Sequence, residues 1–322
     1  MPDGNFINLR LRNSFDVSSA RKLAKFIREN NIEIVHAHLA RDYPVASLAV
    51  RLAPNVKLVL TRHVLFPLNF LQKFVLGNIS KVIAVSGAVE TNLKKTFPAE
   101  KIAVIYNGIE TEKWTNPDYR NLRESFRFAH DISFDALLIG IVGELKPLKG
   151  QEDFVLAARI TARKFPEARF VIVGKDNSRG QNFRQKLKRL VKVFGLESRF
   201  LWLDWVEETI EPLAALDVFV SASHSESFGL AIVEAMASSR AVVATETDGA
   251  KEIIENDKTG KLASIGNPVE LAETVGALLA DENLRRVLGE NARKAALERF
   301  GVERMISETE KVYREITIGE KL

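Results

Sequence analysis

The sequence predicts an α/β protein with two doubly wound domains, each built around a parallel sheet. Short apolar runs rich in β-branched residues alternate with helical patterns, as expected of strand–helix–strand units. The alternation is interrupted once, between residues 109 and 134, and then starts again. A length of 322 residues suits two domains of ordinary size.

The first series accounts for an N-terminal domain over residues 1–110. Its strands are almost continuously apolar, which is typical of parallel strands buried on both faces. Helices are expected between them, including one with Ala20, Ala24 and Ile27 on a single face and one capped by Ser86 that runs to Lys95. The strands are expected at residues 32–37, 56–61, 81–85 and 102–106.

The second series accounts for a C-terminal domain over residues 136–300. Residues 111–135 lack a clean strand and are expected to form the linker with a first helix, and residues 301–322 a helix that packs back toward the N-terminal domain. Helices are expected at residues 154–165, 182–194 and 229–237. The strands are expected at residues 137–142, 169–173, 200–203, 218–221 and 241–245.

Composition excludes several classes of protein. The chain has no cysteine, which excludes disulfides, cysteine-bound metals and thiol nucleophiles. The sequence contains no run of about 18 uncharged apolar residues, so it predicts no membrane-spanning helix. Residues 1–5 have no basic or apolar region of a signal peptide. We therefore expect a cytoplasmic protein, with a peripheral contact at the inner face of the membrane as the alternative.

Charge is distributed unevenly along the chain. Residues 1–110 contain 15 lysines and arginines against 8 acidic residues, whereas the remainder contains 31 against 34. This asymmetry indicates that the first half meets something anionic, such as a phosphorylated lipid or a membrane surface. Positive charge scattered over a solvated surface is an equal alternative. No block of consecutive basic residues or stacking aromatic motif indicates nucleic acid.

Ligands of doubly wound sheets bind at the carboxyl ends of the strands, so the loops that follow the strands are the candidate sites. After the strand at 137–142, residues 143–150 combine glycines with Lys149 at the start of a helix, an arrangement that attracts phosphate. The loop has neither the Walker nor the GxGxxG pattern, and a structural turn with a solvated lysine is the default alternative.

Two carboxylates follow the strand at 218–221. Glu226 lies in the turn, and Glu234 interrupts the apolar helix that follows. A carboxylate among apolar residues needs hydrogen-bond donors, and the vicinal diol of a ribose would supply them. Two solvated glutamates on an amphipathic helix are the alternative. After the strand at 241–245, Gly249 allows backbone to approach a ligand, with an ordinary turn as an equal alternative.

The segment SESFGLAIVEAMA, with Glu226 and Glu234, resembles the Glu-x7-Glu signature of the retaining family-4 (group 1) nucleotide-sugar glycosyltransferases. The loop ending at Lys149-Gly150 and the stretches at 34–38 and 106–109 agree with it. The resemblance implies the GT-B fold, in which two Rossmann-like domains face a cleft. It also implies a nucleotide-diphosphate sugar as donor substrate, no cofactor and no metal, and the sequence lacks an Asp-x-Asp metal motif.

The resemblance also implies residue roles. Lys149 would contact the donor diphosphate, Glu226 would sit beside the donor sugar, and Glu234 would bind the ribose. His38 matches the active-site histidine that faces the reacting sugar and acceptor, so the catalytic candidates are His38, Glu226 and Lys149. His36 and His63 are expected in the core, and His224 is expected to line the cleft. The further donor-binding candidates are Gly143, Ser227, Phe228, Gly229 and Leu230.

Two departures from the family pattern matter. Glu144 stands where the family often has arginine, so either it points away or phosphate binding depends on Lys149 and the helix end. The usual strand and glycine-rich loop before residue 15 are not found, so we expect an N-terminally shortened first domain. A sheet without central strands exposes apolar surface, which predicts a partner, a dimer or poor solubility.

The sequence therefore predicts a retaining glycosyltransferase of envelope polysaccharide or glycolipid synthesis. The donor would be a UDP-, GDP- or ADP-sugar, and the acceptor an anionic or lipid-linked molecule. The alternative is a non-catalytic sugar-nucleotide-binding or partner subunit. An epimerase or phosphorylase of the same fold is disfavoured by the Glu-x7-Glu context.

Overall fold

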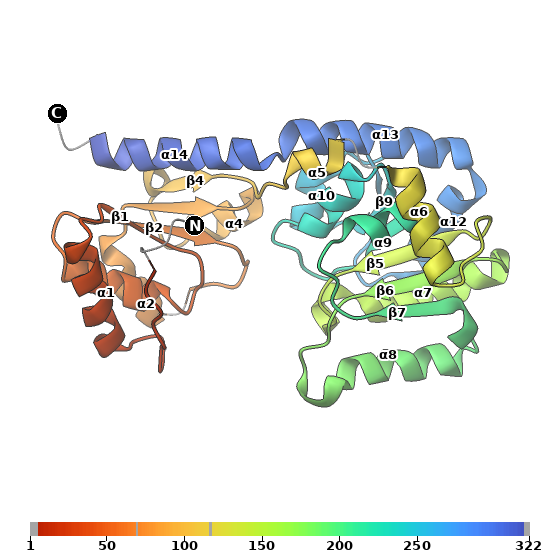
Figure 1. The fold of residues 1–322 in the computed structure, drawn as a ribbon, viewed down its shortest axis with the longest axis horizontal. Helices are drawn as coiled ribbons and strands as arrows, with labels where there is room; N and C mark the ends of the chain where they lie inside the picture. The colour runs from red at the N-terminus through yellow and green to blue at the C-terminus, as the bar shows by residue number, and fades with distance from the viewer. Residues whose placement is uncertain (1–5, 69, 116–117, 319–322) are drawn as a thin grey trace. The chain divides into compact units, whose positions relative to one another are not determined.

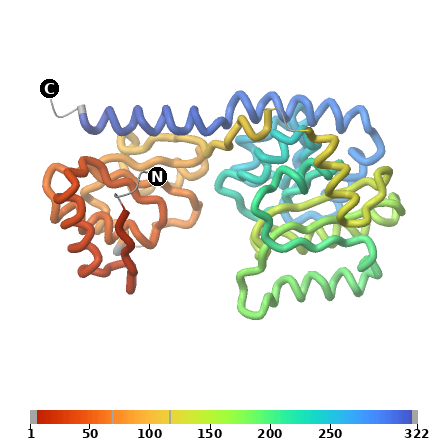
Figure 2. Tube along the Cα trace, viewed as in Figure 1, coloured from red at the N-terminus to blue at the C-terminus, as the bar shows by residue number. Residues whose placement is uncertain are grey.

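The computed structural model describes residues 6–68, 70–115 and 118–318 (Figure 1, Figure 2). The chain folds as two compact units. The first unit contains the residues up to Tyr106 and those from Met305 onward, and the second contains Asn107–Arg304. Residues 1–5, on which the signal-peptide expectation rests, lie outside the described residues. Among the described helices, none has both the length and the apolar character needed to cross a bilayer.

The first unit is built on a four-stranded parallel sheet. The strands follow the order of the chain, and each lies within two residues of its predicted position. Ser86 caps α4 (Gly87–Leu93) as expected, because its side chain accepts the N–H of Val89 at 3.2 Å. The strands are β1 (Ile34–Ala37), β2 (Lys57–Arg62), β3 (Lys81–Ala84) and β4 (Ile102–Val104).

Both faces of this sheet are covered. Helices α1 (Val17–Glu29) and α2 (Tyr43–Arg51) pack on one face, against Val35 of β1. On the other face, Val312 of α14 (Val302–Ile318) and Val59 of β2 belong to one apolar cluster, against which Ile34 of β1 also packs. Figure 1 shows α14 running along β4. Consecutive residues of β1 thus face opposite layers, as strand geometry requires. The C-terminal helix α14 therefore supplies one of the two helical layers that cover the sheet of the first unit.

The second unit is built on a six-stranded parallel sheet of order β10-β9-β8-β5-β6-β7. Five strands match the prediction, and the short β10 was not expected. The order reverses between β5 and β8, which makes this the topological switch point of the sheet. The strands are β5 (Leu138–Val142), β6 (Arg169–Val173), β7 (Phe200–Leu203), β8 (Val218–Ser221), β9 (Ala241–Thr245) and β10 (Lys261–Ala263).

Helices surround the second sheet. One face packs against α7 (Gln151–Lys164), α8 (Asn182–Val193) and α12 (Pro268–Ala280). Alternate strand residues such as Leu138 and Val171 lie outside that cluster and are also buried, so the opposite face is covered as well. The remaining helices of the unit include α9 (Ile210–Ala215), α10 (Leu230–Ala237), α11 (Asp248–Ile253) and α13 (Glu282–Arg299).

The segment 111–135, expected as a linker, belongs to the second unit. It forms α5 (Thr111–Thr115) and α6 (Tyr119–Ala129). Arg127 of α6 is completely buried and donates to the Asp217 carboxylate at 2.9 Å and to the Ala136 carbonyl at 2.8 Å. The charged residues that make this segment resemble a linker therefore include its main anchor to the sheet.

Candidate functional site

The switch point brings together two loops that are far apart in the sequence. Strands β5 and β8 are parallel neighbours, so their carboxyl ends lie at the same edge of the sheet. The loop at 143–150 follows β5 and the loop at 222–229 follows β8; we call them the Lys149 loop and the Glu226 loop. The Nζ atom of Lys149 lies 2.5 Å from Oε2 of Glu226, and both side chains are mostly buried. Two of the three predicted catalytic residues therefore form one ion pair.

Backbone contacts fix these two loops against each other. Gly150 has a φ of 64°, and a Cβ atom there would lie 1.8 Å from the Ala222 carbonyl oxygen, so the approach requires glycine. The His224 N–H donates to the Leu148 carbonyl at 2.9 Å, and its Nε2 lies 2.6 Å from Oδ2 of Asp153. His224 thus joins the Glu226 loop to the Lys149 loop and to α7, a role that the sequence did not indicate.

The Glu226 loop is also supported by the loop after β9. The Gly249 N–H donates to the Glu226 carbonyl at 3.1 Å, and a Cβ atom on Gly249 would lie 2.5 Å from the Phe228 carbonyl oxygen. The close approach of Gly249 is therefore to the Glu226 loop. Phe228 is buried and packs edge-on against Phe300. These contacts position the predicted backbone segment from Ser227 to Leu230 at the start of α10.

Glu234 lies on α10, away from the Glu226 ion pair. Its Oε2 accepts a hydrogen bond from the Thr209 hydroxyl at 3.0 Å. Burial raises the pKa of Glu234, and the Thr209 hydroxyl offsets part of this effect. Among the residues that the structure describes, the carboxylate has one hydrogen-bond donor, and the cost of its burial would fall further with a second.

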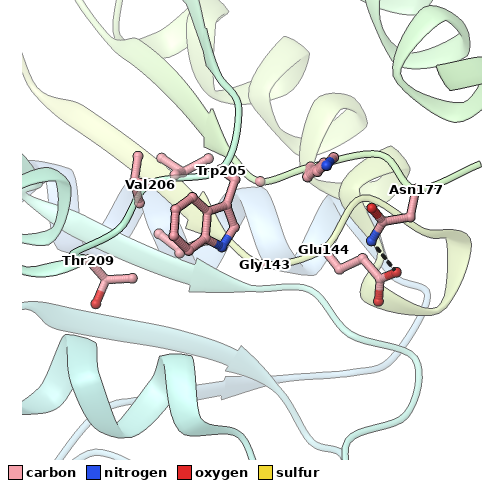
Figure 3. Close-up of a pocket in the computed structure, with 10 residues that line it drawn as sticks. Gly143, Glu144, Asn177, Trp205, Val206 and Thr209 are labelled. Carbon is pink, nitrogen blue, oxygen red and sulfur yellow. Dashed lines mark hydrogen bonds between the residues drawn. The ribbon is translucent and has the colours of Figure 1, made fainter. Parts of the chain in front are cut away.

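A cavity of about 630 Å³ opens at the carboxyl ends of β5, β6 and β7. Figure 3 shows Trp205, Val206 and Thr209 toward one end, and Glu144 with Asn177 toward the other. Because Thr209 also bonds Glu234, this cavity adjoins the predicted ribose site. Trp205 and Thr209 were not predicted, although they follow a predicted strand and the rule about strand ends would have found them. The remaining lining residues are Val142, Gly143, Val173, Gly174 and Lys175.

Glu144 lines this cavity and does not point away from it. Its carboxylate lies 2.7 Å from the Lys146 ammonium group and accepts from the Asn177 amide at 3.1 Å (Figure 3). The hydrogen bond from Lys146, followed by that from Asn177, lowers the pKa of Glu144. The negative charge at the usual arginine position is thus matched by a lysine two residues later.

His38, the third predicted catalytic residue, belongs to the first unit. It follows β1, and its ring centroid lies 4.2 Å from that of His36 and 5.7 Å from that of His63. His36 is held on both sides: its Nδ1 lies 2.6 Å from the Tyr313 hydroxyl and its Nε2 lies 2.7 Å from the Thr61 hydroxyl. Tyr313 was not predicted, and no local pattern could link it to a residue 277 positions away.

The surroundings of the histidine cluster favour the neutral imidazoles. Burial lowers the pKa of His36 to about 4, and the neighbouring His38 and His63 contribute to this shift. Burial also lowers the pKa values of His38 and His63. In the described part of the chain, no group of histidine, aspartate and glutamate side chains is arranged to hold a metal ion.

Comparison with known families decides the class of this protein. The family model for glycosyl transferases group 1 matches residues 123–295, and the model for Glycosyltransferase Family 4 matches residues 2–113. The chain belongs to this glycosyltransferase family. The resemblance based on Glu226 and Glu234 is thereby confirmed, while the N-terminal shortening of this glycosyltransferase stays a prediction.

Individual relatives agree with this assignment. N-acetyl-alpha-D-glucosaminyl L-malate synthase of Bacillus anthracis is 29% identical over 95% of this chain and 81% of its own. The capsular polysaccharide biosynthesis glycosyltransferase CapM of Staphylococcus aureus is 27% identical over 76% of this chain and 60% of its own. A glycosyltransferase structure from Rickettsia africae superimposes with a TM-score of 0.84 at 26% identity, covering 96% of this chain and 84% of that one.

These matches confirm the predicted fold class and reaction class. The two parallel sheets match those of GT-B glycosyltransferases. As a group 1 enzyme, the protein is a retaining, metal-independent glycosyltransferase that uses a nucleotide-sugar donor.

Proposed function

We propose that this glycosyltransferase binds a nucleotide-diphosphate sugar on its second unit and transfers the sugar to an acceptor hydroxyl in envelope polysaccharide or glycolipid synthesis. The observation that carries the proposal is the Lys149–Glu226 ion pair at the switch point of the second sheet. At this edge of the sheet, the Lys149 ammonium group can bind the diphosphate of the donor, and the Glu226 carboxylate can accept hydrogen bonds from the hydroxyls of its sugar.

The donor would lie along the carboxyl ends of the strands in three parts. The base would occupy the cavity beside Trp205, which is 69% exposed and could stack on the base. The ribose hydroxyls would donate to Glu234, which supplies the second donor that this buried carboxylate can use. The diphosphate would meet Lys149 and the start of α7, where free backbone N–H groups favour an anion.

Lys149 would act mainly in the transition state. As the bond to the leaving diphosphate breaks, negative charge grows on the phosphate oxygens and positive charge on the sugar ring. An ammonium group in a site screened from water stabilises the growing negative charge more than it stabilises the bound donor. Glu226, held against Lys149, would contact the sugar hydroxyls. In the front-face route that the family resemblance implies, the leaving phosphate accepts the acceptor proton.

We assign the acceptor to the first unit, where His38 would face the reacting hydroxyl. Its neutral imidazole can donate to one oxygen and accept from another without adding charge near the sugar. The excess of basic residues in the first 110 positions supports an anionic or lipid-linked acceptor. The relationship to CapM supports a role in envelope polysaccharide synthesis. We place the enzyme in the cytoplasm, at the inner face of the membrane.

A binding experiment on Glu234→Ala tests this function. Hydrogen bonds to a charged group contribute about 1.5–3 kcal/mol, so the variant should bind its nucleotide sugar at least about tenfold more weakly. A thermal-shift screen of UDP-, GDP- and ADP-sugars first identifies the donor, and calorimetry then compares the variants. The control is Glu255→Ala, since Glu255 is exposed and pairs with Lys258 on the surface.

Equal donor affinity for the wild type and Glu234→Ala would contradict the placement of the ribose. Transfer activity separates the proposal from the alternative of a non-catalytic subunit. The enzyme should release nucleotide slowly from its donor even without acceptor, through hydrolysis. Tight binding of the donor without release of nucleotide, with or without added acceptors, would favour the non-catalytic subunit.

A further inference from the structure

The first unit exposes large apolar side chains beside the histidine cluster. The exposed fractions are 64% for Leu39, 40% for Val64, 67% for Phe66, 81% for Phe70 and 75% for Phe74. We call these five residues the aromatic patch, after the three phenylalanines among them. Contiguous apolar side chains of this size on a surface mark an interaction site.

The patch is presented by anchored backbone. In α3 (Phe70–Val75), Phe70 and Phe74 lie one turn apart on the same face, while Leu68 before the helix and Leu76 after it are buried. The Val75 carbonyl accepts from Ser47 of α2 at 2.7 Å. The segment is therefore held by its buried residues, and its phenylalanines point outward.

Two further contacts join the parts of the patch. The Gln72 amide of α3 donates to the Ala40 carbonyl at 3.2 Å, which ties the helix to the loop that carries Leu39. The Arg62 guanidinium, at the end of β2, donates to the Phe66 carbonyl. The loops after β1 and β2 and helix α3 thus form one surface of the first unit.

The charge around the patch identifies its partner. From residue 43 to residue 89 the sequence contains no aspartate or glutamate, and the basic residues next to the patch are Lys73 and Arg51. Lys57 and Lys81 begin β2 and β3 at the opposite edge of the sheet, and Arg62 is buried. Lys73 lies between Phe70 and Phe74 and is exposed, and the Arg51 guanidinium bonds the Val75 carbonyl at the end of α3. Asp42 lies near Leu39, but the adjacent Arg41 offsets its charge. A basic surface that is apolar at its centre matches anionic lipid.

We propose that the first unit docks on an anionic lipid surface through the aromatic patch. Phenylalanines would enter the boundary between headgroups and acyl chains, and Lys73 and Arg51 would meet lipid phosphates. A second copy of this chain is a poorer occupant, because a symmetric contact would place the same positive charges against each other. Leu39 directly follows His38, and Val64 directly follows His63. A lipid-linked acceptor would therefore reach the histidine cluster from this surface, an inference that rests on the proposed function.

Vesicle sedimentation of the full chain tests the proposal. The wild type should bind phosphatidylcholine vesicles that contain about one-third phosphatidylglycerol, and bind pure phosphatidylcholine vesicles at least about tenfold more weakly. The double variant Phe70→Ser/Phe74→Ser should lose about tenfold or more of the binding to the anionic vesicles. The matched control is Phe128→Ser, which removes an 83% exposed phenylalanine from the second unit and should bind as the wild type does.

A second variant tests charge separately from apolar area. Lys73→Glu should weaken binding to the anionic vesicles and leave binding to pure phosphatidylcholine unchanged. Absence of wild-type binding to the anionic vesicles, or equal binding by the double variant, would overturn the proposal. A wild-type dimer in light scattering that the double variant dissociates would assign the patch to a second copy instead. Donor binding measured on the same samples shows whether the nucleotide site remains intact, so failure of the docking proposal is distinguishable from failure of the proposed function.

Discussion

The two units hold the polar groups of their candidate sites in different ways. In the second unit, positive and negative side chains are paired directly: Lys149 with Glu226, and Arg127 with Asp217. In the first unit, the cluster around His36 is held by the hydroxyl groups of Tyr313 and Thr61, and burial lowers the pKa values of its histidines. The site at the switch point uses ion pairs, and the histidine cluster uses neutral hydrogen bonds.

The difference corresponds to what each unit would bind. A nucleotide diphosphate brings negative charge into the site. The Lys149 ammonium group is already paired with the Glu226 carboxylate, so it can bind a phosphate with little reorganisation of the site. An acceptor hydroxyl is uncharged, and a neutral histidine can donate to it or accept from it. The contrast teaches that the charge state of each cluster depends on how its side chains are packed.

The largest expected effect is on the stability of the second unit. Arg127→Ala removes the cation beside Asp217 and leaves a mostly buried carboxylate with one fewer partner, which should lower the free energy of unfolding by about 3–5 kcal/mol. Urea unfolding followed by tryptophan fluorescence measures this, since all three tryptophans (Trp114, Trp202 and Trp205) lie in the second unit. Arg120→Ala, which removes only an exposed pair with Glu124, should change stability by less than about 0.5 kcal/mol. Equal effects of the two variants would contradict the anchoring role of Arg127.

The next effect is on turnover. Lys149→Ala should lower kcat by about 100- to 1,000-fold, because one electrostatic partner of the leaving group is lost. The KM for the donor should change less than kcat if Lys149 acts in the transition state. Lys186→Ala is the control, since Lys186 forms an exposed pair with Glu152 on α7. Unchanged kcat in Lys149→Ala would remove the ion pair from the proposed mechanism.

A smaller effect concerns the pH dependence of the first unit. The pKa of His36 is about 4 in the folded protein, below the ordinary value of 6.5, so the unfolded chain binds the proton more readily. Its contribution to stability is complete above pH 6.5 and is lost as the pH falls toward 4. With solvent screening, the loss should be about 2–3 kcal/mol.

Circular dichroism of urea unfolding at pH 7 and pH 4.5, compared between the wild type and His36→Asn, isolates this contribution. The variant should lose less stability on acidification than the wild type. Parallel pH profiles for the two proteins would show that His36 is not the buried neutral group described above.

The smallest expected effect comes from the C-terminal helix. Tyr313→Phe removes the hydroxyl partner of His36 Nδ1 and should destabilise the first unit by about 1 kcal/mol. Thr317→Ala, on the same helix, removes only hydrogen bonds to the helix's own Tyr313 and Arg314 carbonyls and should change stability by a few tenths of a kcal/mol. Hydrogen exchange of the amides in β1 and β2 provides the comparison. A change that is no larger for Tyr313→Phe than for Thr317→Ala would show that His36 does not depend on this partner.

Some features of the site were predicted from the sequence because they are local. The apolar strands, the Ser86 cap and the spacing of Glu226 and Glu234 all depend on residues that lie within eight positions of each other along the chain. The role of His224 as a link between loops was not predicted, since its partner Asp153 lies 71 residues away. The helices over residues 111–129 were expected as part of a linker because the buried position of Arg127 has no local sign.

By itself, the sequence determined the two series of strands and helices, the charge asymmetry and the pair of carboxylates that points to a sugar nucleotide. Only the tertiary structure decided that β5 and β8 are neighbours, and therefore that Lys149 meets Glu226 across 77 residues. It also decided that the last helix supplies Tyr313 to His36. The physical reason is that local patterns arise from near neighbours along the chain, whereas strand order depends on which of several similar apolar edges pair, and that choice is made by the packing of the whole unit.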